Sequence, residues 1–183
     1  MSEALDPART VHLCVDMQRL FSAEGPWPTP WLDRVLPRVT DLSTRLAPHT
    51  VFTRFVPPAT PDEAPGYWQA YYRRWRSATR EHLDPTLIDL MPPLAALAPP
   101  ARVVDKPVYS AFAGPRLHRQ LRAQGIDTLV VTGSETDVCV LATVLGAVDL
   151  GYRVIVVTDC ICSSSDEGHD ALLAVYRRRY GVQ

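Results

Sequence analysis

The chain has 183 residues, of which 19 are Lys or Arg and 20 are Asp or Glu, so its formal net charge is −1. This length accommodates one α/β domain with a substantial core and is too short for two ordinary domains. The balanced charge excludes the broad basic surface that nucleic-acid binding requires. We therefore expect one domain over residues 1–183 and no nucleic acid among its partners.

The sequence contains no segment that predicts secretion or membrane insertion. Its first twenty residues lack a basic stretch followed by an apolar one, and no run of about 18 apolar residues follows. A cytoplasmic protein without a membrane partner is expected. The cysteines lack the CxxC spacing of zinc and redox sites, so each is judged singly: Cys14, Cys139, Cys160 and Cys162.

Short β-branched runs bounded by turn signals predict five buried strands. They are Val11–Val15, Thr50–Val56, Arg102–Val104, Thr128–Thr132 and Arg153–Thr158. Segments with helical spacing alternate with them, at about Leu32–Leu46, Pro115–Gln124, Asp137–Leu150 and Ser165–Arg179. Nearly continuous apolar strands between helices indicate a parallel sheet covered on both faces. We predict a three-layer α/β/α sandwich with five to six strands, in which a sixth strand after Gly181 would be very short or truncated.

The stretch from Pro57 to Pro100 departs from this alternation. It is rich in proline and contains a cluster of aromatic residues: Tyr67, Trp68, Tyr71, Tyr72 and Trp75. A long irregular insertion in a compact domain is usually a functional lid or a disordered segment, and this many aromatic residues argues against disorder. We expect an ordered cover over part of the domain.

Three polar residues follow predicted strands at their carboxyl ends, where ligands bind in open α/β sheets. Asp16 follows the run that begins at Val11, and Lys106 follows the third strand. Cys139 comes a short turn after the fourth strand and begins the most apolar helix. If the three strands are neighbours, these side chains converge at one edge of the sheet.

The three residue types fit nucleophilic catalysis. A cysteine in the first turn of a helix and near an ammonium group is expected to have a thiol pKa lowered toward neutrality. Asp16 could take the thiol proton and return it to a leaving amine, while Lys106 keeps that carboxylate ionised. The turn from Gly133 to Cys139 supplies backbone N–H groups at a helix N-terminus, where an oxyanion would form.

These motifs resemble those of the isochorismatase-like, or cysteine hydrolase, superfamily. This superfamily includes nicotinamidases, carbamoylsarcosine amidases, ureidoacrylate and biuret hydrolases, and isochorismatases. The segments that carry the resemblance contain the aspartate, the lysine and the cysteine in family order and spacing: Val15–Gln18, Asp105–Phe112 and Val131–Val140. The resemblance extends over nearly the whole chain, from Val11 to His169.

The resemblance implies a role for each matched residue. Asp16 would be the general base and acid, Lys106 its partner, and Cys139 the nucleophile that forms a thioester-type acyl-enzyme. It also implies a cis peptide bond between Ser134 and Glu135, which would aim the N–H groups of Glu135 and Cys139 at the oxyanion. No cofactor is implied.

Two departures from the family pattern narrow the activity. Nicotinamidases have a metal-binding Asp-x-His after the second strand, whereas this chain has Arg54 and Phe55 there, so no metal site is expected. True isochorismatases, which cleave a vinyl ether, can lack the cysteine. Cys139 therefore favours cleavage of a carbon–nitrogen bond in an amide, ureido or carbamoyl compound. A vinyl-ether hydrolase and an inactive binding protein with the same fold are the alternatives.

The substrate and the assembly are less well determined by the sequence. Arg54 either binds a substrate carboxylate or pairs with a surface acid. Four aromatic residues either form the wall of the substrate pocket or hold the insertion on the domain: Trp68, Tyr72, Trp75 and Phe112. Because family members are commonly oligomers and the insertion carries much aromatic surface, we expect a homodimer or homotetramer. The sequence does not identify the small-molecule substrate.

Overall fold

A computed structural model of the chain describes residues 4–181, in which five parallel strands form one sheet in the order β3-β2-β1-β4-β5. The strands are β1 (Thr10–Val15), β2 (Thr50–Phe55), β3 (Arg102–Lys106), β4 (Thr128–Ser134) and β5 (Arg153–Cys162). The predicted parallel α/β fold is confirmed. Residues 4–181 contain no sixth strand. The position expected for it, after Gly181, falls on residues 182 and 183, which lie outside the described part of the chain.

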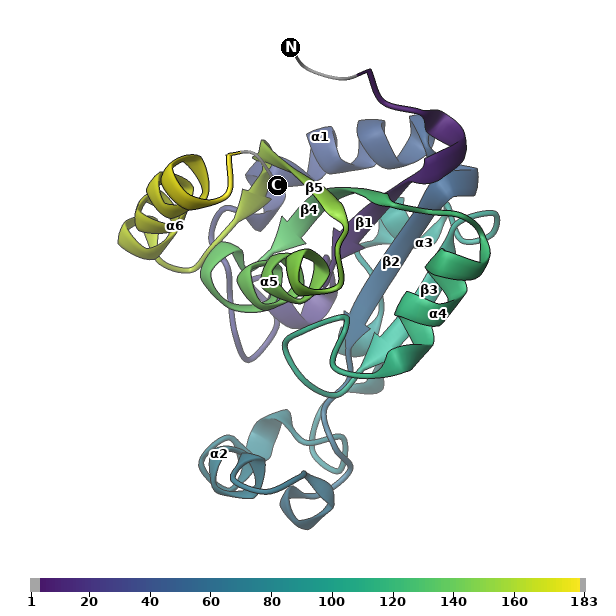
Figure 1. Cartoon of the computed structure of the whole chain (residues 1–183). Coiled ribbons are helices and arrows are strands. Elements are labelled where there is room, and N and C mark those ends of the chain that lie inside the picture. The colour runs from purple at the N-terminus through teal and green to yellow at the C-terminus, as the bar shows by residue number, and fades with distance from the viewer. Residues whose placement is uncertain (1–3, 182–183) are drawn as a thin grey trace.

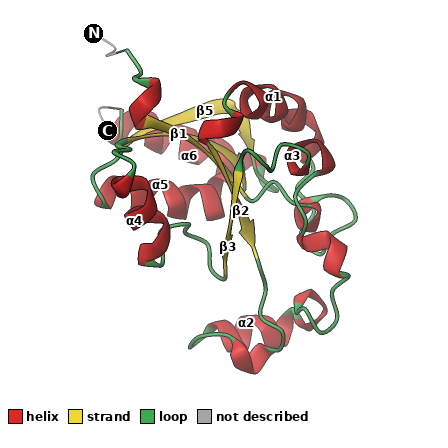
Figure 2. Ribbon diagram, turned by 90° about the vertical axis from the view of Figure 1, so that its right-hand side faces the viewer, coloured by secondary structure: helices red, strands yellow, loops and turns green. Residues whose placement is uncertain are grey.

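Helices cover both faces of the sheet. They are α1 (Leu32–Arg45), α2 (Trp68–Arg74), α3 (Pro92–Ala95), α4 (Pro115–Ala123), α5 (Leu141–Asp149) and α6 (Asp166–Arg179). Figure 2 shows α1 and α3 on one face, and α4, α5 and α6 on the other. Single turns of 3-10 helix lie at Pro7–Arg9, Arg19–Phe21, Ala47–His49, Pro61–Glu63, Arg76–Ala78 and Pro85–Ile88, and one π-helical turn spans Thr136–Val140.

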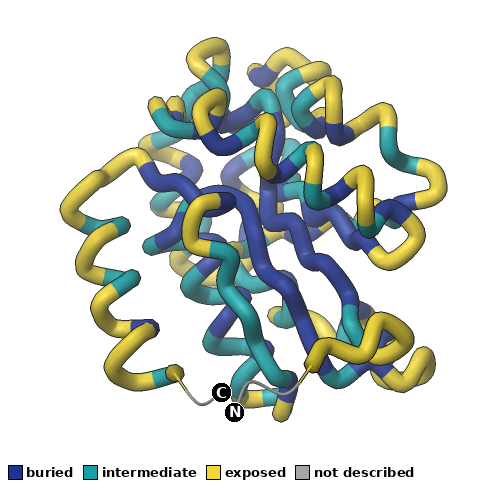
Figure 3. The backbone as a smooth tube through the Cα atoms, turned by 90° about the horizontal axis from the view of Figure 1, so that it is seen from above, coloured by how far each residue is buried: buried dark blue, intermediate teal, exposed yellow. Residues whose placement is uncertain are grey.

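The central strands are buried because each contributes side chains to both layers. In β1, Leu13 and Val15 belong to the apolar cluster under α4 and α5, while Cys14 belongs to the cluster under α1. Successive strand residues point to opposite faces, so a fully covered strand must be apolar at nearly every position. The dark blue strands at the centre of Figure 3 show this burial.

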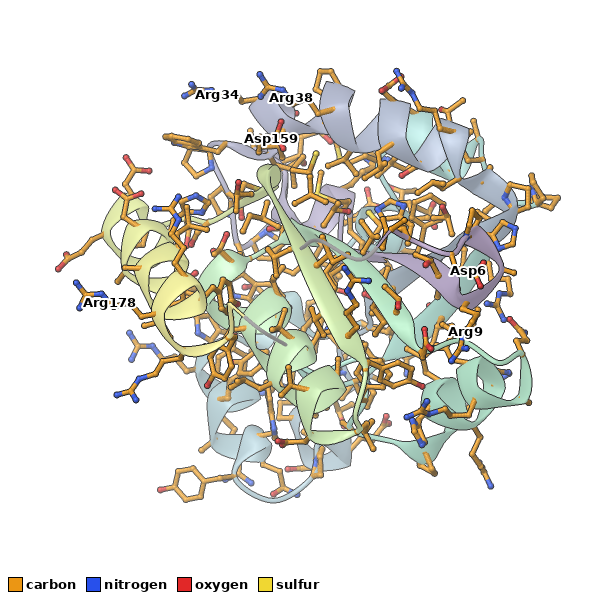
Figure 4. All side chains as sticks on the ribbon, turned by 45° about the horizontal axis from the view of Figure 1, so that its top comes forward. Asp6, Arg9, Arg34, Arg38, Asp159 and Arg178 are labelled. Atoms are coloured by element: carbon orange, nitrogen blue, oxygen red, sulfur yellow. The ribbon has the colours of Figure 1, made fainter. Side chains whose placement is uncertain are left out.

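Helix α1 packs on the sheet through a stripe of buried residues at helical spacing, which includes Leu32, Val35 and Val39. Its outer face also reaches β5, where Arg38 lies 3.7 Å from Asp159 (Figure 4). Both of these side chains are largely exposed, so their ion pair contributes only about 0–1 kcal/mol. The position of α1 therefore depends on the apolar stripe.

The insertion between β2 and β3 is ordered and contains α2, α3 and three of the 3-10 turns. Figure 1 shows α2 beyond the carboxyl ends of β2 and β3. Tyr72 of α2 is buried in the same apolar cluster as the inward-facing residues of α1.

No helix within residues 4–181 is both long and apolar enough to cross a membrane.

Candidate active site

Asp16 lies directly after β1, where the backbone leaves the strand. Its φ of 49° is in the left-handed region, which is uncommon for residues other than glycine and is tolerated by aspartate more than by most. The carboxylate is fully buried, and its Oδ1 accepts a hydrogen bond of 2.6 Å from Thr53 Oγ1 in β2. The turn thus directs a buried carboxylate toward the carboxyl ends of the neighbouring strands.

Lys106 is the last residue of β3, and its ammonium group reaches Asp16 across the end of β2. Its Nζ lies 2.6 Å from Asp16 Oδ2 and donates a hydrogen bond of 3.0 Å to the carbonyl oxygen of Val108. The ring of Phe55, which is paired with Lys106 in the sheet register, lies 5.3 Å from Nζ. A short, buried ion pair therefore occupies the floor of the site.

Cys139 belongs to the π-helical turn that precedes α5. Two bonds to the Glu135 carbonyl shape this turn, from the N–H groups of Val138 at 3.1 Å and Val140 at 3.0 Å. The second bond spans five residues, which is the π-helical pattern often found at functional sites. The structure has a cis peptide bond between Ser134 and Glu135, at the position that the family resemblance implied. The Cys139 thiol is buried and lies within the electrostatic reach of Asp16 and Lys106.

The sequence led us to expect a lowered pKa for the Cys139 thiol, and this expectation is wrong. Burial raises the thiol pKa well above its usual value, the Asp16 carboxylate raises it further, and the Lys106 ammonium lowers it only in part. Desolvation disfavours the charged thiolate, and an adjacent carboxylate adds like-charge repulsion. The protein therefore presents a protonated thiol beside an ion-paired carboxylate.

Gly133 allows β4 to approach β1 closely just before this turn. Its φ is 118°, and a Cβ atom there would lie 2.0 Å from the carbonyl oxygen of Val15. That distance is far inside any real contact, so only glycine fits. The close approach brings the cysteine turn next to Asp16, which directly follows Val15.

A cavity of about 130 Å³ lies above Cys139. It is lined by Phe21, Trp27, Phe55, Tyr71, Tyr109, Glu135, Val138 and Cys139. Trp27 is central to this wall, with ring centroids 6.2 Å from Phe21, 6.0 Å from Phe55 and 6.3 Å from Tyr71. The site is therefore a small aromatic pocket with the thiol at its base.

Arg54 does not line this pocket. Its guanidinium makes two hydrogen bonds to Asp105, at 2.7 Å and 3.0 Å, and one of 3.4 Å to Asp89. Because side chains alternate along a strand, Arg54 points away from the face to which Thr53 and Phe55 point. The sequence left two roles open for Arg54, contact with a substrate carboxylate or pairing with a surface acid. The structure shows Arg54 paired with two acids.

The four aromatic residues proposed for substrate binding are also placed elsewhere, since none of them lines the Cys139 pocket in the part of the chain that the structure describes. Trp68 packs edge-on against Tyr109, with ring centroids 4.7 Å apart. Trp75 packs against Trp27 from behind, and Tyr72 is a core residue of the insertion. Phe112 stacks on Tyr152 at 5.6 Å in the cluster under α5.

Sequence reasoning missed several residues of the site. Trp27 lies in the loop between β1 and α1, where no periodicity predicts the direction of a side chain. Tyr109 comes three residues after Lys106, which was an available signal, whereas Phe55 comes next to Lys106 only through the register of β2 and β3. Gln18 is buried and bonds the backbone of Phe55 in both directions, from Phe55 N to Oε1 at 2.7 Å and from Nε2 to Phe55 O at 3.1 Å. It thereby fixes the end of β2 beside the pocket.

Residues 4–181 contain no group of three or more His, Cys, Asp or Glu side chains that could hold a metal ion. Arg54 and Phe55 occupy the positions at which the family's metal-binding motif would lie. We therefore assign no residue to a metal.

Residues 10–183 match the isochorismatase domain, which is most of the chain. The chain belongs to the isochorismatase family. Curated members of the isochorismatase family that resemble it include an uncharacterized protein of Bacillus subtilis, 42% identical over 78 residues, which are 43% of this chain and 41% of that protein. Maleamate amidohydrolase of Pseudomonas putida is 38% identical over 88 residues, which are 47% of this chain and 41% of the enzyme. The chain thus spans less than half the length of these two relatives.

A solved structure within the isochorismatase fold matches nearly the whole chain. A cysteine hydrolase from Pseudomonas syringae pv. phaseolicola superimposes with a TM-score of 0.81 at 24% identity, covering 98% of this chain and 92% of that one. At this identity the likeness shows the fold alone.

Proposed function

We propose that this chain hydrolyses a carbon–nitrogen bond of a small amide, ureido or carbamoyl compound, with Cys139 as the nucleophile. One observation carries the proposal. The Cys139 thiol lines a small pocket and is close enough to Asp16 for that carboxylate to raise the thiol pKa, and Asp16 is ion-paired with Lys106 at 2.6 Å. A nucleophile within reach of a base that a third group orients is the arrangement that covalent catalysis requires.

The first half of the reaction forms an acyl-enzyme. Asp16 takes the thiol proton, and the Sγ atom of Cys139 attacks the substrate carbonyl carbon, whose oxygen becomes an oxyanion. The backbone N–H groups of Glu135 and Cys139 are the proposed donors to this oxyanion. The C–N bond then breaks as Asp16 delivers its proton to the leaving nitrogen, which leaves a thioester on Cys139.

The second half releases the acid. Asp16, again ionised, takes a proton from a water molecule, whose oxygen attacks the thioester carbon. The thiolate leaves and regains its proton from Asp16, which completes the cycle. Lys106 stays charged throughout and stabilises the ionised form of Asp16.

The raised thiol pKa supports a carboxylate base in this mechanism. With burial holding Cys139 in its protonated form, attack requires a group that removes the proton as the bond forms. A positioned general base typically contributes about 10²–10⁴-fold in rate. Asp16 is the carboxylate with the largest effect on the pKa of the thiol.

Ammonia release from a panel of primary amides, ureas and carbamoyl amino acids tests the activity. A substrate should be turned over by the wild-type chain and not by Cys139→Ala, and intact-protein mass spectrometry after rapid quenching should find the acyl group on Cys139. Cleavage of a vinyl ether, assayed separately through its carbonyl product, that is retained by Cys139→Ala and lost in Asp16→Ala would point to vinyl-ether hydrolysis. A chain inactive on the whole panel, with a thiol inert to iodoacetamide, would indicate the inactive binding protein.

The proposed assembly is a homodimer or homotetramer in which the insertion of one subunit contacts another. Tyr67, at the beginning of α2, is 92% exposed, and Trp68 and Tyr71 lie next to it beside the mouth of the pocket. One fully exposed ring beside two half-buried ones, Trp68 and Tyr71, is typical of a surface covered by a partner. Sedimentation velocity at micromolar concentration should find a mass of at least twice 20.4 kDa; a monomer would contradict the assembly.

A further inference from the structure

The pocket above Cys139 has a wall of aromatic rings. The rings belong to residues from the loop after β1, the end of β2, helix α2 and the loop after β3: Phe21, Trp27, Phe55, Tyr71 and Tyr109. The face of an aromatic ring carries partial negative charge and attracts a cation placed within about 6 Å. Several rings around one small cavity therefore favour a positively charged group inside it.

Glu135 belongs to the same wall. Burial raises the pKa values of Cys139, Tyr71 and Tyr109, which also line the pocket, and the Glu135 carboxylate adds to each rise. Its Oε2 accepts a hydrogen bond of 2.9 Å from the backbone N–H of Ser164, which follows β5. This bond fixes the direction of the side chain from outside the pocket. A carboxylate has room for about four hydrogen bonds, so Glu135 can also accept bonds from a ligand.

No arginine or lysine is among the residues that line this pocket. Lys106 lies beside the pocket, but its Nζ is 2.6 Å from Asp16 Oδ2, so the charges of these two side chains cancel. The Glu135 carboxylate is then left as an unbalanced negative charge. Its field reaches the neighbouring rings: burial raises the pKa of Tyr109, and Cys139 and Glu135 add to that rise.

We propose that the pocket recognises amides that carry a positively charged nitrogen and discriminates against amides that carry a carboxylate, with Glu135 as the specificity-determining residue. The aromatic rings supply cation–π attraction, and the carboxylate supplies the counter-charge. A substrate carboxylate would meet aromatic rings and a like charge in a partly desolvated cavity whose wall contains no arginine or lysine, while Lys106 beside it is already paired with Asp16. The cavity of about 130 Å³ restricts the substrate to a few heavy atoms beyond its amide group. This inference rests on the proposed hydrolysis at Cys139.

Charge-matched thiol reagents test the recognition without any turnover. Cys139 is reacted with 2-aminoethyl, methyl and 2-sulfonatoethyl methanethiosulfonate, which carry a positive, a neutral and a negative group. Each rate is followed by mass spectrometry of the peptide that contains Cys139 and is divided by the rate of N-acetylcysteine with the same reagent. We expect the cationic reagent to exceed the anionic one by at least about tenfold, as for one unbalanced charge several ångströms away at an effective dielectric near 20.

Two variants separate Glu135 from the charge of the whole chain. Glu135→Gln keeps an oxygen acceptor for Ser164 N–H and removes the charge, so the tenfold preference should fall to about twofold or less. Glu81→Gln removes the same charge from an exposed residue of the insertion that does not line the pocket, so its preference should remain that of wild type. Equal rates for both charges in wild type, or a full preference in Glu135→Gln, would overturn the proposal.

Hydrolysis of three small amides then separates this inference from the proposed function. Glycinamide, propionamide and malonamate differ in charge at similar size, and kcat/KM should fall in that order in wild type and become similar in Glu135→Gln. Rapid hydrolysis of malonamate would contradict the charge recognition while leaving the proposed hydrolase intact. A charge preference in thiol labelling, with no hydrolysis of any amide, would contradict the hydrolase and retain the recognition.

Discussion

The Nζ atom of Lys106 lies 2.6 Å from Oδ2 of Asp16, and the two side chains are 4% and 0% exposed. Removing both charges from water is costly, and their attraction offsets that cost only with good geometry and further hydrogen bonds. Thr53 supplies such a bond to Asp16, and the Val108 carbonyl accepts one from Lys106. Two apolar side chains could fill the same volume at a lower cost in free energy. Stability therefore does not explain the two charges, and we attribute them to the proposed chemistry at the adjacent thiol.

The first prediction is that Asp16→Asn and Lys106→Met displace the pH dependence of Cys139 alkylation in opposite directions. The Asp16 carboxylate raises the thiol pKa and the Lys106 ammonium lowers it, while burial, the largest cause of the rise, stays in both variants. Asp16→Asn should therefore be alkylated faster than wild type at pH 8, and Lys106→Met more slowly. Rates with iodoacetamide between pH 6 and 10, read on the Cys139 peptide, measure this.

Both variants should nevertheless lose turnover, by at least about 10²-fold for Asp16→Asn if it is the general base. A thiol that becomes more reactive while the enzyme becomes inactive would separate the role of Asp16 in proton transfer from any effect on folding. If the two alkylation curves move together, the three side chains do not interact as the structure has them.

The second prediction concerns stability and uses a double variant as its control. Lys106→Met leaves Asp16 as an uncompensated buried charge, which typically costs about 3–5 kcal/mol in the free energy of unfolding. Asp16→Asn together with Lys106→Met removes both charges, so most of that loss should be recovered. Urea unfolding at pH 7 measures all three chains. A double variant as unstable as Lys106→Met would mean that packing, rather than charge, causes the loss.

The sequence predicted the sheet and the convergence of the three polar residues. Its β-branched runs locate the five strands, although β3, β4 and β5 each continue beyond the predicted range, to Lys106, Ser134 and Cys162. Since carboxyl ends of parallel strands meet at one edge, the positions of Asp16 and Lys106 after their strands were sufficient to bring them together. The strand order with β1 between β2 and β4 then brings the cysteine turn next to Asp16.

The sequence could not predict the electrostatics of the thiol or the wall of the pocket. The pKa of Cys139 depends on its burial, and burial depends on tertiary packing that no spacing rule contains. The alternation of β2 shows that Arg54 and Phe55 face opposite ways, but only the bond from Thr53 to Asp16 shows which face belongs to the site. Trp27 enters the pocket from an irregular loop, where the direction of a side chain is set by its contacts.

The third prediction is that His12 lowers stability in mild acid. Its ring is buried in the sheet between Thr50 and Thr132, with distances of 3.2 Å from Nδ1 to Thr50 Oγ1 and 2.8 Å from Nε2 to Thr132 Oγ1. Burial lowers its pKa from 6.5 to about 4. The unfolded chain therefore binds a proton that the folded chain does not, between pH 6.5 and about 4.

The stability contributed by neutral His12 is complete above pH 6.5 and is lost as the pH falls toward 4. The difference in pKa corresponds to a loss of about 3 kcal/mol over that window. Urea unfolding at several pH values should give a shallower dependence for His12→Gln than for wild type. The exposed His49, replaced by Gln, is the matched control and should leave the wild-type slope unchanged. Equal slopes for wild type and His12→Gln would contradict the lowered pKa.

The fourth prediction concerns Gly168, in the first turn of α6, and Asp137, two residues before Cys139. A Cβ atom on Gly168 would lie 2.4 Å from Asp137 Oδ2, while Asp137 Oδ1 is held by the Ser163 hydroxyl. Gly168→Ala should therefore destabilise the chain by about 1–3 kcal/mol, the usual cost of overpacking. It should also lower kcat/KM, because the carboxylate that must move belongs to the same turn as Cys139, the proposed nucleophile.

Removing the carboxylate should reverse the sign of this effect on stability. In an Asp137→Ala background nothing as close as that oxygen opposes the new methyl group, and alanine is favoured over glycine in a helix by about 1 kcal/mol. Gly168→Ala should then raise the free energy of unfolding, which gives a coupling energy of at least about 2 kcal/mol in the double-variant cycle. Unfolding in urea of the four chains measures the cycle. The contact between α6 and the cysteine turn would be disproved by additive effects, that is, by Gly168→Ala changing stability equally in both backgrounds.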